Sequence, residues 1–259
     1  MSNINQQNSK QYEDKKKFFD SVITLYGRNV VEEILEDSSV KIHKLHVSSS
    51  NRFEGTMKNI MRLAESKGVE IVTHDKNSLS RISKNAKQDQ GVAIDVISPN
   101  YNSVDDLTTK LPSKYRLLAL DGIQNPQNLG MIIRSAAAGK IDGIILPKKN
   151  SAKLSPLVMK ASAGTLFKID LYFCSNLEDG LKKLINEATI YTLSSYAETS
   201  LYELKVSDKS VFVLGNESEG VSEEVSTLAT SSVKIPMNRG VESLNVATTA
   251  TLIAFFWLH

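Results

Sequence analysis

The side chains best suited to chemistry lie in three polar clusters, each of which follows an apolar run. The first is Asn125-Pro-Gln-Asn128-Leu-Gly130 with Arg134 shortly after it, the second is Leu214-Gly-Asn-Glu217 with Gly220, and the third is residues 235–245. They supply amides, a carboxylate and a guanidinium, which are groups that hold anions or exchange protons. Polar loops on a rigid frame usually carry binding groups, so these clusters are the first candidates for a site.

Each cluster also has a plainer explanation. Asn128 is placed to cap the helix that follows it, and Ser243 or Asn245 can cap the last helix of the chain. Arg134 lies six residues beyond Asn128, almost two helical turns away, where an isolated arginine is usually a surface or ion-paired residue. What favours a site is that all three clusters follow the carboxyl ends of predicted strands, where open α/β sheets place their ligand crevice.

Several other chemistries are disfavoured. The chain has no Gly-x-Gly, so it lacks the dinucleotide fingerprint and the common glycine-loop methyltransferase site. Residues 215–220 have the glycine spacing of a P-loop, but Val221 occupies the position of the phosphate-binding lysine. No metal site is expected, because the four histidines lack metal-ligand spacing and are interpreted as surface or packing residues. Cys174, the only cysteine, is expected to be a buried small hydrophobe.

The bulk composition is that of a globular protein with two domains. The chain has 259 residues, of which 41% are hydrophobic and 23% charged, and its net charge is +2. Residues 41–87 carry ten Lys/Arg against four acids, and residues 134–168 carry seven against one. Such basic patches suit a polyanionic partner. The amino terminus has no apolar signal region and no apolar run could span a bilayer, so we expect a cytoplasmic protein without a membrane partner.

The elements that must position the clusters fall into two alternating series. A disordered tail is expected over residues 1–19 and a small α/β domain over residues 20–98, with helices near 27–37, 53–67 and 75–84 and strands near 44–48, 69–73 and 91–97. Residues 99–114 are expected to be a linker with one helical turn.

The second series covers residues 115–259. Its predicted strands are 115–120, 143–146, 169–173, 189–193, 211–214 and 232–235, and its predicted helices are 129–138, 156–163, 177–186, 222–228 and 246–258. This alternation predicts a mostly parallel sheet with helices on both faces.

The three clusters, in this order and spacing, resemble the motifs of the SpoU/TrmH family (SPOUT class) of RNA ribose 2′-O-methyltransferases. The resemblance covers about residues 115–258 and includes Ile235-Pro-Met237 and Ser243-Leu244-Asn245-Val246. Residues 27–35 and 90–93 more weakly resemble the family's RNA substrate-binding domain, which points to the rRNA-modifying branch.

The resemblance implies a trefoil knot in the second domain, S-adenosylmethionine as cofactor, RNA as substrate and a homodimer with the active site near the dimer interface. The implied cofactor-binding residues are Leu214, Gly215, Asn216, Gly220, Ile235, Met237 and Leu244. An adenine suits a flat apolar slot with a few backbone donors and acceptors, and Gly215 permits a close backbone approach.

The implied catalytic residues are Arg134, Asn128, Glu217, Ser243 and Asn245. An arginine is a poor general base because its pKa exceeds about 12, so we assign Arg134 to a bidentate grip on the adjacent phosphate. Glu217 is the other candidate to take or steer the proton, with a structural carboxylate as the alternative. Ser243 and Asn245 are equally well explained as helix caps.

The expected reaction is methyl transfer from S-adenosylmethionine to a ribose 2′-hydroxyl, on a guanosine or other nucleotide of large-subunit rRNA. The alternatives are the same reaction on tRNA and a non-catalytic role in RNA binding or ribosome assembly.

Overall fold

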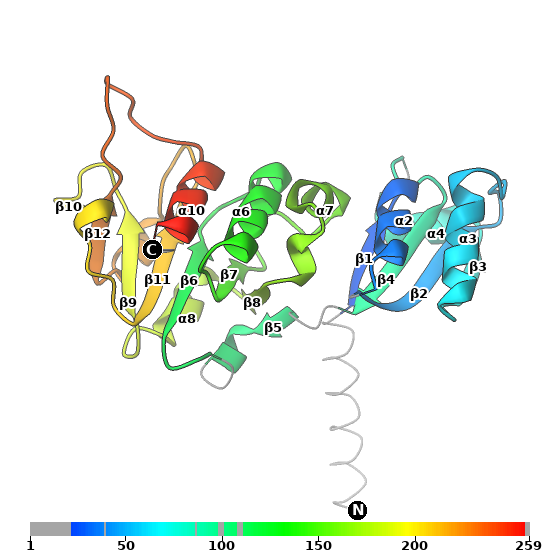
Figure 1. Cartoon of the computed structure of the whole chain (residues 1–259), viewed down its shortest axis with the longest axis horizontal. Helices are drawn as coiled ribbons and strands as arrows, with labels where there is room; N and C mark the ends of the chain where they lie inside the picture. The colour runs from blue at the N-terminus through cyan, green and yellow to red at the C-terminus, as the bar shows by residue number, and fades with distance from the viewer. Residues whose placement is uncertain (1–21, 39, 86, 98–100, 108–110, 257–259) are drawn as a thin grey trace, which may run out of the picture. The chain divides into compact units, whose positions relative to one another are not determined.

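A computed structural model describes residues 22–38, 40–85, 87–97, 101–107 and 111–256. The tail predicted over residues 1–19 lies outside the described residues. The chain divides into two compact units, with the boundary between Tyr101 and Asn102 (Figure 1). No helix among the described residues is long and apolar enough to cross a membrane.

The first unit is a four-stranded sheet with three helices. Its strands are β1 (Val22–Tyr26), β2 (Lys41–Ser48), β3 (Glu70–His74) and β4 (Val92–Ile97), in the order β1-β4-β2-β3. β4 is antiparallel to both β1 and β2, and β2 is parallel to β3. The helices are α2 (Arg28–Glu36), α3 (Thr56–Ser66) and α4 (Lys76–Ser83). β1 was not predicted, although its alternating burial is typical of a half-buried strand.

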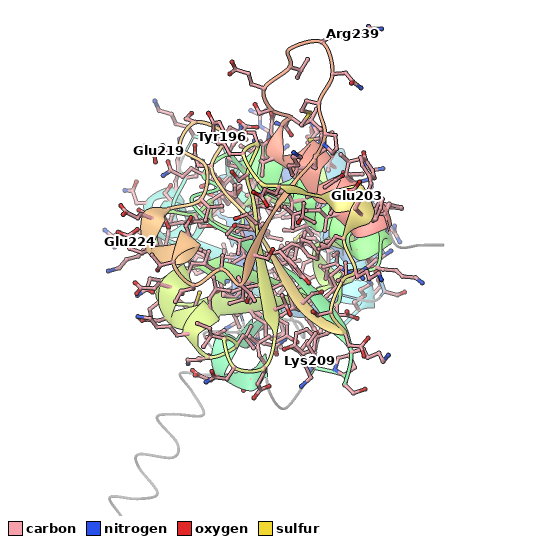
Figure 2. The ribbon with its side chains drawn as sticks, turned by 90° about the vertical axis from the view of Figure 1, so that its left-hand side faces the viewer. Tyr196, Glu203, Lys209, Glu219, Glu224 and Arg239 are labelled. Carbon is pink, nitrogen blue, oxygen red and sulfur yellow. The ribbon has the colours of Figure 1, made fainter. Side chains whose placement is uncertain are left out.

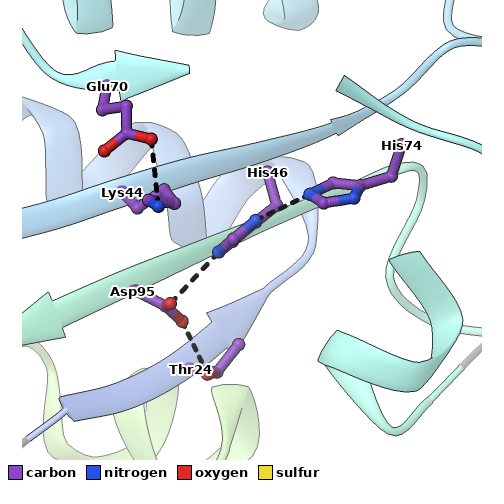
Figure 3. Close-up of polar contacts among 6 residues, drawn as sticks. All are labelled: Thr24, Lys44, His46, Glu70, His74 and Asp95. Carbon is purple, nitrogen blue, oxygen red and sulfur yellow. Dashed lines mark hydrogen bonds and ion pairs between the residues drawn. The ribbon is translucent and has the colours of Figure 1, made fainter. Parts of the chain in front are cut away.

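A chain of hydrogen bonds crosses the polar side of this sheet and joins two histidines (Figure 3). His46 Nδ1 lies 2.9 Å from His74 Nε2, and His46 Nε2 lies 3.1 Å from Asp95 Oδ2. Thr24 Oγ1 donates to Asp95 Oδ1 over 2.6 Å. His46 is buried, which agrees with the prediction of a packing residue, and the structure adds that its ring is hydrogen-bonded on both sides. His259 lies outside the described residues.

This pairing gives a testable pH dependence. Burial, together with the neighbouring His46, lowers the pKa of His74 below its usual 6.5. The folded protein therefore binds this proton less tightly than the unfolded chain, and folding loses stability as the pH falls through 6.5. NMR titration of the His74 ring in the full chain is expected to show a pKa below 6.5, and His46→Gln is expected to raise it. A wild-type value at or above 6.5 would contradict the structure.

The second unit is built on an eight-stranded sheet. Its strands are β5 (Tyr101–Ser103), β6 (Tyr115–Leu120), β7 (Gly143–Pro147), β8 (Asp170–Cys174), β9 (Thr189–Leu193), β10 (Thr199–Ser200), β11 (Lys209–Leu214) and β12 (Ser231–Lys234). They lie in the order β10-β12-β9-β11-β6-β7-β8-β5, and every ladder from β10 to β8 is parallel. The predicted mostly parallel sheet is therefore confirmed.

Helices cover both faces of this sheet, as predicted. α6 (Pro126–Ala138), α7 (Pro156–Ser162) and α10 (Val246–Phe255) pack together on one face, with α6 in the centre (Figure 1). α8 (Leu177–Lys182) and α9 (Glu223–Ser226) lie on the other face. That second face holds a buried core to which β6, β8 and β11 contribute Leu117, Tyr172 and Val213. Strands buried on both faces explain the near-continuous apolar runs in the sequence.

Two predicted boundaries differ from the structure. The segment expected to be a linker, residues 99–114, contains β5, which is an edge strand of the second sheet, and the short 3-10 helix Val104–Asp106. The helix predicted to begin at Leu129 begins at Pro126, because Asn125 is its N-cap and proline is well suited to the first helical position.

Candidate active site and cofactor pocket

The strand order places a crevice at one edge of the second sheet. From β6 the chain passes outward to β7 and β8, whereas β11 and β9 lie on the other side of β6. Ligands of open α/β sheets bind at such a reversal, outside the carboxyl ends of the strands. The loops after β6, β9, β11 and β12 all leave from this edge. Figure 2 shows Tyr196 and Glu219 at this end of the sheet and Arg239 at the tip of the projecting loop between β12 and α10.

A cavity of about 520 Å³ lies at this edge, within the usual size range of small-molecule pockets. Its apolar wall includes Leu214, Ile235, Met237 and Leu244. All seven residues predicted to bind the cofactor line it, namely Leu214, Gly215, Asn216, Gly220, Ile235, Met237 and Leu244. Segments up to 30 residues apart in sequence are thus brought to one cavity, which has the apolar surface and backbone groups that an adenosyl group requires.

The rim of this cavity is a tight loop over residues 215–220. Asn216 and Gly220 exchange both backbone hydrogen bonds, at 2.9 and 2.8 Å, and Asn216 Nδ2 donates to the Gly122 carbonyl after β6. A Cβ on Gly215 would lie 2.1 Å from the carbonyl carbon of Gly220. Glycine at position 215 is therefore required for the loop to fold back on itself. The close backbone approach expected at Gly215 is made to Gly220 of the same loop.

A second group of side chains joins three elements next to the cavity. Glu217 Oε1 accepts hydrogen bonds from Asn128 Nδ2 at 3.1 Å, from Asn245 Nδ2 at 2.5 Å and from the backbone N–H of Val246 at 3.5 Å. Asn245 Nδ2 also donates to Asn128 Oδ1 at 3.1 Å. The carboxylate thus links the loop after β11 to α6 and to the start of α10. We call Asn128, Glu217 and Asn245 the amide–carboxylate cluster.

The prediction that Asn128 caps α6 is wrong. Asn125 is the N-cap, since its Oδ1 accepts from the backbone N–H of Gln127 at 2.8 Å. Asn128 lies inside the first turn, where it is buried and faces Glu217 and Asn245. The earlier helix start causes the difference, because it moves Asn128 from the end of the helix to its inner side.

Of the two proposed caps of α10, Asn245 is the one used. Asn245 Oδ1 accepts from the backbone N–H of Ala247 at 2.9 Å, so one amide serves both as the cap and as part of the cluster. Ser243 is exposed and lines the cavity. The cap fixes which end of the Asn245 amide faces Glu217, and this explains why its Nδ2 is the donor.

Arg134 does not contact the cluster. It lies on α6, is exposed, and makes no side-chain hydrogen bond or ion pair with the residues that the structure describes. Its guanidinium is therefore free to bind an anion, whereas Asn128, Glu217 and Asn245 are already bonded to one another. The structure thus places three of the five predicted catalytic residues in a preformed cluster, Ser243 at the cavity, and Arg134 apart from both as a cation without an ion pair among the described residues.

Sequence reasoning missed the part of the cavity that follows β9. Thr192, Ser194 and Tyr196 line the cavity, and the Tyr196 side chain is 95% exposed. The signal was present, because polar residues follow the predicted strand 189–193 as they follow the other strands of the crevice.

Two family models match this chain. Residues 115–255 match the SpoU rRNA Methylase family, and residues 24–102 match the RNA 2′-O ribose methyltransferase substrate binding domain. A relative from Xylella fastidiosa, the 23S rRNA (guanosine-2′-O-)-methyltransferase RlmB, is 30% identical over 235 residues, which are 89% of this chain and 94% of the relative.

Solved structures share the fold. The SpoU methyltransferase AviRb from Streptomyces viridochromogenes, in complex with AdoMet, has a TM-score of 0.68 at 19% identity and covers 93% of this chain and 90% of its own. A putative RNA methyltransferase of the TrmH family from Porphyromonas gingivalis has a TM-score of 0.65 at 25% identity, with the same coverage.

The fold, the cavity and these matches together define an S-adenosylmethionine-dependent RNA 2′-O-methyltransferase. The chain belongs to the SpoU rRNA methylase family.

Proposed function

We propose that this protein methylates the 2′-hydroxyl of a guanosine in large-subunit rRNA. The observation that carries the proposal is the match of both units, one to the methylase model and one to the substrate-binding model of RNA 2′-O ribose methyltransferases. The proposed target is taken from the Xylella relative, which is named as a 23S rRNA (guanosine-2′-O-)-methyltransferase and aligns with 89% of this chain. We propose the cytoplasm as the place where the protein acts.

The cofactor site is proposed to be the cavity at the carboxyl edge of the second sheet. Ile235, Met237 and Leu244 would form the apolar slot for the adenine, and the backbone at Leu214 and Gly215 would supply polar contacts. Asn216 and Gly220 would hold the rim, since their backbone hydrogen bonds close the loop. When bound, S-adenosylmethionine supplies an electrophilic methyl group.

The residues of the chain would orient the ribose that is methylated. Arg134 would hold the neighbouring phosphate with two parallel N–H···O bonds, which fixes the position of the 2′-hydroxyl. Glu217 would act as a positioning residue, because its Oε1 fastens Asn128 and Asn245 in place. Ser243, at the rim of the cavity, would contact the substrate through its hydroxyl.

We further propose a homodimer and the trefoil knot that the family resemblance implies. The homodimer is supported by exposed apolar side chains on α6 and α10, where Met131 is 48% and Phe255 is 39% exposed. The same surface of α6 carries the unpaired Arg134, so a second copy of the chain packed there would bring its site close to that guanidinium.

The reaction is tested with labelled S-adenosylmethionine and three purified RNAs, namely large-subunit rRNA, small-subunit rRNA and tRNA, followed by digestion to nucleosides. We expect label in 2′-O-methylguanosine from the large-subunit rRNA alone. Label in tRNA alone would replace the proposed substrate. Cofactor binding without label in any RNA or in ribosomal subunits would indicate a non-catalytic role in RNA binding or ribosome assembly.

The cofactor site is tested by Gly215→Ala. The added methyl would collide with the backbone of Gly220 and displace the rim of the cavity, so we expect S-adenosylmethionine affinity to fall by roughly tenfold or more. Calorimetry measures this directly, with Ser218→Ala on the exposed side of the same loop as the control. Wild-type affinity in Gly215→Ala would show that the cofactor binds elsewhere.

A further inference from the structure

A second polar pocket lies at the same edge of the second sheet, on the far side of β6 from the cofactor cavity. We call it the β7–α7 pocket. It measures about 530 Å³ and is lined by Gln124, Pro126, Asn150, Ser151, Ala152, Lys153 and Ser155. None of these residues lines the cofactor cavity. Nothing in the proposed chemistry uses this pocket.

Two hydroxyl groups in this pocket lack partners. The Oγ atoms of Ser151 and Ser155 are buried, and neither has a hydrogen-bond partner among the described residues. Ser155 stands at the N-cap position of α7, yet its side chain makes no capping hydrogen bond. Buried hydroxyls are nearly always hydrogen-bonded, so these two have hydrogen-bonding capacity left for a group that enters the pocket.

The charge around the pocket favours an anion as that group. The loop between β7 and α7 carries Lys148, Lys149 and Lys153, all exposed, whose ammonium groups make no ion pair with the described residues. Of the described residues that line the pocket, none is acidic. Pro126 at the pocket wall is the first residue of the thirteen-residue helix α6, whose amino end adds positive potential. An anion with several oxygen acceptors matches both the lysines and the free hydroxyls.

The pocket is held beside the amide–carboxylate cluster. The backbone N–H of Ala152 donates to the carbonyl of Ile123 at 2.8 Å, which ties the lysine loop to the turn after β6. The same turn leads through Asn125 into α6, whose first turn carries Asn128. The pocket wall at Pro126 and the cluster residue Asn128 therefore both belong to the first turn of α6.

We infer that the β7–α7 pocket binds a backbone phosphate of the substrate RNA that flanks the modified nucleotide. This inference rests on the proposed function, since it assumes that the ligand at the cluster is RNA. The phosphate oxygens accept hydrogen bonds from Ser151 and Ser155, Lys153 at the pocket wall neutralises its charge, and Lys149 on the same loop adds to the positive potential. The pocket positions the RNA and takes no part in the methyl transfer itself.

The lysines are tested with Lys149→Gln/Lys153→Gln and a matched control, Lys160→Gln/Lys168→Gln. The control removes the same charge from the same basic stretch, at exposed positions outside the loop between β7 and α7 that carries Lys149 and Lys153. Binding to protein-free large-subunit rRNA is measured over a series of salt concentrations. We expect the pocket variant to bind about tenfold more weakly and the slope of log K against log [salt] to fall by about 1, with cofactor affinity unchanged. Equal behaviour of the two variants would overturn the inference.

The hydroxyls are tested with Ser151→Ala/Ser155→Ala. These hydroxyls make no hydrogen bond with the described residues of the free protein, so their removal does not lower its free energy of unfolding. The melting temperature is therefore expected to stay equal or rise. RNA affinity is expected to fall several-fold, and the KM for RNA to rise while kcat is retained. A lower melting temperature with unchanged RNA affinity would show that the two serines are structural and would overturn the inference.

Failure of this inference is distinguishable from failure of the proposed function. If wild-type protein neither binds nor methylates large-subunit rRNA, the proposed function fails and the pocket loses its assigned ligand with it. If wild-type protein binds and methylates this RNA while the lysine and serine variants match their controls, the function stands and the pocket assignment alone is wrong.

Discussion

Arg134→Ala is expected to abolish methyl transfer while S-adenosylmethionine affinity stays within a few-fold of wild type. The side chain is exposed, makes no ion pair with the described residues, and does not line the cofactor cavity, so its removal leaves that cavity intact. Without the grip on the phosphate, the ribose is no longer held for attack. Misplacement by about 1 Å costs on the order of 100-fold in rate, and loss of the whole contact costs at least as much.

The assay for Arg134 combines single-turnover methyl transfer with calorimetry of the cofactor. Arg134→Lys is the informative control, because lysine keeps the charge but cannot make two parallel hydrogen bonds. We expect this variant to bind RNA nearly as well as wild type and to transfer the methyl group more slowly. Full activity in Arg134→Ala would remove the guanidinium from the mechanism. Loss of cofactor binding in the same variant would assign Arg134 to the cofactor site.

The second unit was largely predictable because its strands are buried on both faces. A short apolar run with a polar cluster after it, such as residues 115–120, predicts a buried strand. The structure places β6 at the predicted positions. The residues that line the proposed cofactor cavity were implied by the family resemblance, and strand ends alone indicated only that the polar clusters would lie near one another. The predicted knot, in contrast, concerns the path of the whole chain, which no local pattern of residues encodes.

The first unit and the fine geometry of the site were less accessible. β1 is half-buried and follows a polar, lysine-rich stretch, so its short alternation gives little signal. The pairing of His46 with His74 depends on the parallel register of β2 and β3, which sequence spacing does not reveal. The N-cap of α6 was assigned wrongly to Asn128 for a different reason, because Asn125 and Asn128 are both good caps and only the observed start of α6 distinguishes them.

Two hydrogen-bonded carboxylates, Asp95 in the first unit and Glu217 in the second, differ in their surroundings. Although burial raises the pKa of Asp95 in the first unit, hydrogen bonds from His46 and Thr24 outweigh it and lower that pKa overall. Glu217 has a different environment, since it lies on an exposed loop and accepts neutral amide donors. The role of Glu217 is therefore geometric, because its Oε1 accepts from donors on α6 and at the start of α10 and so holds both against the loop after β11.

Replacement of Glu217 is expected to separate geometry from charge. In Glu217→Gln the amide oxygen can still accept from Asn128, Asn245 and the Val246 N–H, because all three donors converge on Oε1. We expect this variant to keep its melting temperature and to stay within about tenfold of wild-type kcat, a loss smaller than that from a missing general base. Glu217→Ala removes the shared acceptor and leaves Asn245 Nδ2 with only its bond to Asn128 Oδ1, so we expect a lower melting temperature and a loss of about 100-fold or more in kcat.

The two Glu217 variants are compared by thermal unfolding and by the pH dependence of single-turnover methyl transfer. If Glu217 only positions its neighbours, Glu217→Gln keeps the shape of the wild-type pH–rate profile. If both variants lose activity equally while Glu217→Gln remains as stable as wild type, the negative charge itself is required. The carboxylate would then be the proton acceptor for the 2′-hydroxyl, through the Oε2 atom, to which no described residue donates a hydrogen bond.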